Sequence, residues 1–197
     1  MHVEPALGVL LGFTALQRIA ELVVSRRNLN SQRRAAAAAG GIVKQCESRA
    51  AFALMVAVQV LLLAAPAAES AFINRPVPVA IFCAALALWL MGQGLRLAAM
   101  HALGNSWNAR GTIASSQPIV RTGPYRWIRH PNYLGVLLEG IALPLAGAAW
   151  YSLIFVNLLL IPVTLRRLRA EERLLEQNPA WREAFARTGR LVPKIQS

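Results

Sequence analysis

The sequence predicts an all-α polytopic integral membrane protein with five transmembrane helices, on composition, hydropathy and charge placement. Of the 197 residues, 56% are hydrophobic and 15% are charged, whereas soluble domains have about 45–50% apolar and about 25% charged residues. The mean hydropathy is +0.43. The formal net charge is +12, and the basic residues gather beside apolar stretches, as in cytoplasmic loops. This placement favours a membrane protein over one that binds nucleic acid.

Apolar stretches define the first three expected spans, residues 5–24, 50–68 and 77–100. Each is long enough to cross a hydrocarbon core of about 30 Å. Residues 25–49 are polar and basic, and we expect a cytoplasmic loop with a short helix over the alanine run 35–39. The positive-inside rule then places the N-terminus outside and the C-terminus in the cytoplasm. We expect the membrane to be a bacterial inner membrane.

Residues 133–165 are apolar but too long for a single span, and Pro144 and Gly147 divide them. We predict a helical hairpin with arms 133–145 and 149–165. Its first arm is short enough to need shielding by protein or local thinning of the bilayer. The single membrane domain 1–197 then comprises three spans in 1–100, a cytoplasmic loop 101–132, the hairpin 133–165 and a basic cytoplasmic C-terminal helix 166–197.

A polar, aromatic and basic segment, residues 121–135, lies between apolar runs, and we name it the central segment. It contains Arg121, Tyr125, Arg126, Trp127, Arg129, His130 and Tyr133. Such a segment is costly beside a membrane unless it binds something. Its aromatic residues fit an interfacial belt or a pocket for a flat or cationic group. With no second histidine or acidic residue at ligand spacing, His130 predicts no metal site, but it could accept a hydrogen bond or carry a proton.

Several ionisable or small residues in the apolar helices have two interpretations. Glu139 lies inside a span at a cost of roughly 2.5–3.5 kcal/mol, which marks a functional candidate such as a general base. Its structural alternative is a partner for Arg96 or Arg129. Arg18 and Glu21 share a helix face and are interpreted as a snorkelling interfacial pair, with a functional contact as the alternative. Glu171 and Glu172 fit either a solvated charged helix or contacts with a ligand. Gly92 and Gly94 fit either close packing between helices or the close approach of a ligand to the backbone.

Residues 123–135, with the complete pattern Arg129-His130-Pro131-x-Tyr133-x-Gly135, followed after a hairpin by Glu171-Glu172, resemble the isoprenylcysteine carboxyl methyltransferase family. The wider group includes phospholipid N-methyltransferases, whose glycine motif resembles Gly92-x-Gly94. The chain also resembles a bacterial subgroup that methylates phenolic lipids such as alkylresorcinols and alkylpyrones. The resemblance implies S-adenosylmethionine as cofactor, bound by Tyr125, Arg129, His130, Pro131, Tyr133, Gly135, Glu171, Glu172, Gly92 and Gly94.

The expected activity is transfer of a methyl group to the carboxyl or phenolic hydroxyl of a lipophilic acceptor at the cytoplasmic face. Expected partners are a lipophilic small molecule or prenylated substrate and membrane lipid, without metal or nucleic acid. The expected catalytic residues are Glu139, His130 and Arg129, with Glu139 or His130 taking the proton of a phenol. The alternative is a nicotinamide-dependent membrane reductase of a lipid or sterol double bond.

Overall fold

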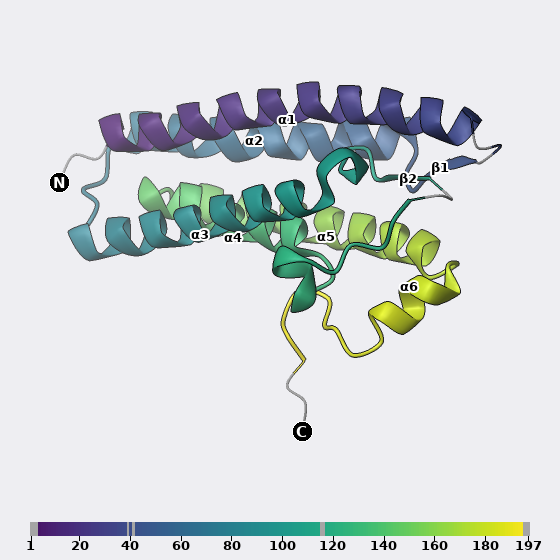
Figure 1. Ribbon diagram of the computed structural model, residues 1–197. Helices are drawn as coiled ribbons and strands as arrows, with labels where there is room; N and C mark the ends of the chain where they lie inside the picture. Colours follow the sequence, from purple (N-terminus) through teal and green to yellow (C-terminus); the bar gives the residue numbers. More distant parts are fainter. Residues whose placement is uncertain (1–3, 39, 41, 115–116, 195–197) are drawn as a thin grey trace.

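The computed structural model describes residues 4–38, 40, 42–114 and 117–194, and five long helices dominate it (Figure 1). They run alongside one another, and their bounds are α1 Glu4–Ala38, α2 Arg49–Ile73, α3 Val79–Leu103, α4 Pro131–Ala146 and α5 Trp150–Leu175. The all-α membrane fold predicted from composition is confirmed. The expected hairpin is also present, as α4 and α5 joined by a short turn.

Among the described residues, four helices are long and apolar enough to cross a membrane, namely α1, α2, α3 with its 3₁₀ extension, and α5. Helix α4 has only 16 residues. It packs chiefly against α3 and also against α2 and α5, so protein rather than lipid surrounds much of its length. Its residues Glu139, Ala142 and Leu143 are fully buried. The total of five spans stays a prediction.

Local chemistry explains where these helices begin and end. The Ser48 hydroxyl accepts a hydrogen bond from Ala51 N at 3.2 Å and caps α2, and Asn74 closes α2 in the left-handed conformation at φ 45°. Pro131 occupies the first position of α4, where its missing N–H costs nothing. At the start of α5, the Glu69 carboxylate accepts bonds from Tyr151 N and Ser152 N.

The prediction of a loop over residues 25–49 is wrong for most of its length. Helix α1 continues without a break to Ala38, because no glycine or proline interrupts the sequence between Gly12 and that residue. Ser25, Leu29 and Ala36 lie on its buried face. Of the expected short helix 35–39, residue 39 lies outside the described residues, as does residue 41.

The single C-terminal helix expected over 166–197 is also wrong. Its first ten residues continue α5, and a separate short helix, α6 (Pro179–Ala184), follows. Asn178 and Pro179 separate the two, because proline disfavours helical geometry in the residue before it and suits the first position of a new helix. Residues 185–194 then fold back against the central segment, and residues 195–197 lie outside the described part.

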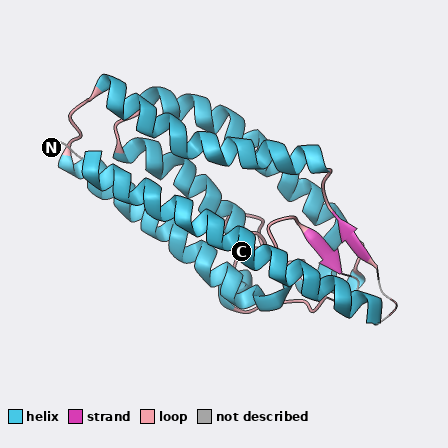
Figure 2. Ribbon diagram, turned by 90° about the horizontal axis from the view of Figure 1, so that it is seen from above, coloured by secondary structure: helices cyan, strands magenta, loops and turns pink. Residues whose placement is uncertain are grey.

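A small antiparallel sheet was not anticipated. Strand β1 (Val43–Gln45) pairs with β2 (Thr112–Ala114), with Lys44 opposite Ile113. Figure 2 shows the two strands in magenta beside the helix ends. The cytoplasmic loop expected over 101–132 also holds two 3₁₀ turns, η1 (Gly104–Ser106) and η2 (Gly123–Arg126), while its first three residues belong to α3. The sheet therefore ties the end of α1 to this loop.

Candidate functional site

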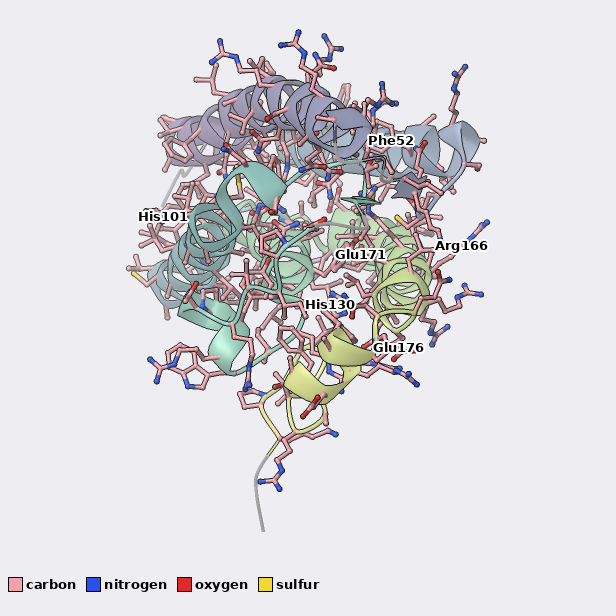
Figure 3. The ribbon with its side chains drawn as sticks, turned by 45° about the vertical axis from the view of Figure 1, so that its right-hand side comes forward. Phe52, His101, His130, Arg166, Glu171 and Glu176 are labelled. Atoms are coloured by element: carbon pink, nitrogen blue, oxygen red, sulfur yellow. The ribbon has the colours of Figure 1, made fainter. Side chains whose placement is uncertain are left out.

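A cavity of about 780 Å³ lies at the end of the bundle that carries the sheet and α6. Five of the predicted site residues line it: Tyr125, Arg129, His130, Tyr133 and Glu171. Figure 3 views this end and shows His130, Glu171 and Phe52 toward its interior, with Arg166 and Glu176 at the outer surface. The central segment and the second hairpin arm thus meet in one place, although about forty residues separate them.

Arg129 fastens the C-terminal residues to the central segment. Its Nε donates to Thr188 O at 2.8 Å, Nη1 to Glu172 Oε1 at 3.0 Å and Nη2 to Phe185 O at 2.8 Å. Its backbone N–H donates to Gly189 O at 2.8 Å. Since every guanidinium nitrogen already has a partner, this geometry favours a structural role for Arg129 over a reacting one.

Glu172 lies behind the cavity wall and is 2% exposed. Its oxygens meet Arg129 at 3.0 Å and Arg190 at 2.8 Å, and His130 Nε2 lies 3.7 Å away. Glu172 therefore neutralises the cations around the central segment. His130 lines the cavity, and among the described residues its Nε2 has no hydrogen-bond partner.

Glu171 faces the cavity one residue earlier on α5. Tyr133 donates its hydroxyl hydrogen bond to Glu171 Oε2, and Arg167 Nε donates to the Tyr133 oxygen at 3.1 Å. Arg167 is itself paired with Glu47 at 3.3 Å. Within the described part of the chain, Glu171 has no cation within 4 Å, so it is a cavity carboxylate without a salt bridge.

Aromatic side chains form one wall of the cavity. Tyr125, Trp181 and Phe185 all line it and belong to one buried apolar cluster, with the Trp181 and Phe185 rings 5.0 Å apart. Burial raises the pKa of the Tyr125 phenol, and the charge of Glu171 raises it further. Tyr125 therefore stays protonated at neutral pH and offers a donor rather than a base.

At the membrane side of the cavity, four charged residues from three helices form a buried network. Glu21 Oε2 meets Arg18 Nη1 at 3.1 Å and Arg96 Nη2 at 2.5 Å. Glu139 Oε1 meets Arg96 Nε at 3.3 Å, and its other oxygen pairs with Arg18. The interpretation of Arg18 and Glu21 as a snorkelling pair is wrong, because both face inward. For Glu139, the geometry favours the structural alternative, pairing with Arg96, over a free base.

The predicted glycines occupy two different environments. A Cβ on Gly92 would lie 3.1 Å from Gly135 O, and one on Gly135 would lie 2.8 Å from Gly92 O. These two residues therefore let α3 and α4 approach closely and do not line the cavity. Gly94 is exposed and has nothing within 4 Å of a Cβ position. Pro131 is buried at the start of α4.

The C-terminal part of α1 holds the loop that covers the cavity. Asn28 donates to Trp107 O at 2.8 Å, Gln32 donates to Asn105 O at 2.7 Å, and Ser25 Oγ accepts from Ala109 N at 2.9 Å. Trp107 is 5% exposed and lines the cavity. The loop over the cavity is thus held by side chains of α1, from a stretch that the sequence analysis expects to be a loop.

Sequence reasoning missed Arg167, Trp181 and Phe185. Arg167 lies one helical turn before Glu171, so both residues are on one face of α5. This spacing could have identified Arg167 as a site residue. The two aromatic residues carry no comparable signal. Cys46 and Cys83 are free thiols. Within the described residues, no three His, Cys, Asp or Glu side chains gather as a metal site requires.

Burial raises the pKa of the Cys46 thiol to about 12, with Glu171 adding to the rise. Only the thiolate is nucleophilic. In a Cys83→Ser variant, we expect Cys46 of the folded protein to react with a maleimide at pH 8 about a thousandfold more slowly than in denatured protein. Because the unfolded thiol ionises more readily, this residue also reduces stability as the pH rises above about 9. Mass spectrometry of the time course measures both rates, and fast labelling of folded protein would contradict the burial of Cys46.

Comparison with known proteins adds family information. Residues 85–177 match the model of the isoprenylcysteine carboxyl methyltransferase (ICMT) family. A Bacillus subtilis protein named "Uncharacterized protein YpbQ" is 27% identical over 169 residues, which cover 86% of this chain and 96% of that protein. The yeast protein-S-isoprenylcysteine O-methyltransferase of Saccharomyces cerevisiae is 34% identical over 90 residues, 45% of this chain and 38% of the yeast protein. The matched residues contain the central segment, the hairpin and Glu171-Glu172.

Proposed function

We propose, on the premise that residues 85–177 of this chain belong to the isoprenylcysteine carboxyl methyltransferase family, that the protein is an S-adenosylmethionine-dependent methyltransferase. Its acceptor is a lipophilic molecule that carries a carboxyl or phenolic hydroxyl group and is methylated at the cytoplasmic face of the membrane. The name of the yeast relative supports the methyltransferase activity. The family resemblance supports S-adenosylmethionine as the cofactor. The residues that line the cavity can be compared with the chemical groups of this molecule.

The unpaired carboxylate of Glu171 carries this proposal. A carboxylate that faces a cavity without a salt bridge favours a cationic ligand. S-adenosylmethionine has two cationic groups, an ammonium and a sulfonium, and a single carboxylate. It also has a flat adenine ring, for which Tyr125, Trp181 and Phe185 supply an aromatic wall. The donor set of the cavity thus fits the cofactor in charge and shape.

The residues of the chain would each have a defined task. When bound, the cofactor would supply an electrophilic methyl group that an acceptor oxygen takes from its sulfonium, leaving a neutral thioether. Glu171 would hold its cationic part, and Tyr133 and Arg167 fix the orientation of Glu171 through their hydrogen bonds. His130 lines the cavity, with its Nε2 3.7 Å from Glu172 Oε1, and would take the proton of a phenolic acceptor. The buried aromatic wall excludes water from the reacting groups.

The charge difference between the two ends of the bundle supports the proposed orientation. At the end where the α4–α5 turn meets the N-terminal part of α1 (Figure 1), Arg75 pairs with Glu69. The cavity end carries many exposed arginines, among them Arg26, Arg27, Arg33, Arg34, Arg121, Arg126, Arg166 and Arg169. By the positive-inside rule, the cavity opens to the cytoplasm, where the cofactor is made, and the N-terminus lies outside, in a bacterial inner membrane.

The test is calorimetric binding of S-adenosylhomocysteine to detergent-solubilised protein. We expect Glu171→Gln to weaken binding roughly 10- to 100-fold, the loss expected for a hydrogen bond to a charged group. Glu176→Gln is the matched control, since Glu176 is exposed directly after the last residue of α5 and does not line the cavity. Equal affinity of both variants would contradict the role of Glu171. No binding by folded wild-type protein, together with binding of a reduced nicotinamide, would overturn the proposal.

A further inference from the structure

Residues 121–127, which include η2, and residues 185–194 form a ledge on the outside of the bundle of long helices. Figure 1 shows both segments on the face of the bundle that lies away from α1 and α2, with residues 185–194 in yellow. Directly after the first segment, Ile128 pairs with Gly189 in a parallel bridge. The bridge joins the two segments, so the ledge is one surface although its parts are about sixty residues apart in the chain.

The ledge rests on α3 at the level where that helix leaves the membrane. A Cβ on Gly123 would lie 3.4 Å from Ala102 Cβ and 3.9 Å from Ala98 O. Val79, the first residue of α3, is apolar and 59% exposed, so hydrocarbon begins near it. At about 1.5 Å per residue, Ala98 and Ala102 lie about 29 and 35 Å further along the helix. Since the hydrocarbon core is about 30 Å thick, the ledge lies beside the head groups of the leaflet at the cavity end.

The side of α3 that leads to the ledge is apolar and open. Met91, Gly94 and Ala98 are three and four residues apart, so they share one side of the helix, and all three are exposed. A Cβ on Gly94 would meet nothing within 4 Å. This strip runs from the hydrocarbon to the ledge, and its glycine lets an acyl chain approach the helix backbone closely.

The ledge itself carries positive charge that no carboxylate balances. Arg121 and Arg126 are exposed, and within the described part of the chain neither lies within 4 Å of a carboxylate oxygen. Neither segment of the ledge contains Asp or Glu. Trp127 is 62% exposed, and the Arg126 guanidinium carbon lies 5.9 Å from the centroid of its ring. Tryptophan is typical of the membrane–water interface, and arginine binds phosphate through parallel hydrogen bonds.

We propose that the ledge and the adjoining strip of α3 bind an anionic phospholipid from the leaflet at the cavity end. Its phosphate accepts hydrogen bonds from Arg126 and is attracted by Arg121, while Trp127 lies at the level of the glycerol backbone. One acyl chain lies on α3 over Gly94. Phosphatidylglycerol is preferred to phosphatidylcholine, because the ledge has no carboxylate for the choline cation. This lipid is bound whether or not the protein transfers methyl groups.

The test is quenching of Trp127 fluorescence by phospholipids with brominated acyl chains, in bilayers that contain the full chain. The protein has five tryptophans, so the emission of Trp127 is taken as the difference between each protein and the same protein with Trp127→Phe. One bilayer mixes brominated phosphatidylglycerol with plain phosphatidylcholine, and the other exchanges the bromine between the two lipids. Each arginine near an anionic surface contributes about a fivefold factor. We therefore expect the first bilayer to quench more strongly, with a preference of roughly 5- to 25-fold for phosphatidylglycerol.

Two double variants with the same change of charge identify the residues responsible. Arg121→Gln with Arg126→Gln should bring the preference close to one, and Arg126→Gln alone should reduce it about fivefold. Arg33→Gln with Arg34→Gln is the matched control. Both residues are exposed on α1, but they lie about 14 Å or more past Val24, where the apolar run of that helix ends. The control should keep the preference of the wild-type protein.

Three outcomes would overturn the proposal. The first is equal quenching of the wild-type protein in the two bilayers, which would show that the head group is not recognised. The second is an equal loss of preference in the two double variants, which would assign it to net charge rather than to the ledge. The third is the absence of quenching of Trp127 in both bilayers, which would show that water or another protein copy, and not lipid, covers the ledge.

Discussion

Alanine at position 135 is expected to loosen the junction of α3 and α4 and to lower the stability of the fold. A Cβ there would lie 2.5 Å from Arg96 Cγ and 2.8 Å from the backbone oxygen of Gly92. The Gly92 backbone belongs to a helix and cannot move away alone, so the two helices must separate. Overpacking of this kind costs about 1–3 kcal/mol or more. Displacement of Arg96 would also disturb its pairs with Glu21 and Glu139.

Thermal unfolding in detergent measures this effect, at one scan rate because membrane proteins often unfold irreversibly. We expect the Tm of Gly135→Ala to fall by roughly 5–10 °C. Gly94→Ala is the matched control, because a Cβ at Gly94 meets nothing within 4 Å and alanine favours a helix over glycine by about 1 kcal/mol. Its Tm should stay the same or rise. Equal Tm values for the two variants would show that α3 and α4 do not pack through Gly135.

Removal of the Glu139 carboxylate should be at least as destabilising. Glu139→Ala leaves the buried Arg18 and Arg96 with only Glu21 between them. Breaking a buried ion pair in this way costs about 3–5 kcal/mol, because an uncompensated charge remains. Glu139→Gln keeps an oxygen that can accept a hydrogen bond, so its loss of stability should be smaller. The double variant Arg18→Met with Glu139→Leu removes one charge of each sign and should recover much of the stability.

The same variants distinguish a structural role from a catalytic one. If Glu139 supports the network, Glu139→Gln should melt earlier yet retain turnover and an unchanged pH profile below its melting temperature. If Glu139 is the base, the variant should stay folded, bind S-adenosylhomocysteine and lose turnover. Normal turnover of Glu139→Gln would leave His130 as the proposed base.

Local signals in the sequence explain most of what could be predicted. The hairpin follows from Pro144 and Gly147 inside an apolar run. Its first arm lies within two residues of the predicted bounds, whereas the second begins one residue later than predicted and continues ten residues further. Polarity alone, however, does not end a helix. Residues 25–38 were assigned to a loop because they are charged, but they lack glycine and proline and continue α1. The rule that places positive charge inside concerns topology, not secondary structure.

Pairings between residues that are far apart in the chain could not be predicted from the sequence. Arg18 and Glu139 are 121 positions apart, and no periodicity or motif links them. Arg167 and Glu47 are 120 apart. By contrast, the residues of the central segment lie close together in the sequence, so their common place at the cavity could be predicted. The clamp from Arg129 to Thr188 and Phe185 also depends on a fold-back of residues 185–194, which the expected C-terminal helix excluded.

That clamp has a consequence for how the protein is made. The ribosome releases the chain from its N-terminal end onward, so α1 to α5 leave it before Phe185 and Thr188 do. Until those residues emerge, two of the hydrogen bonds of Arg129 have no acceptor, and the aromatic wall lacks Trp181 and Phe185. A nascent chain would therefore be inserted but unable to hold a ligand. The site would become able to bind a ligand only when the C-terminal residues fold against Arg129, and not when the helices are inserted.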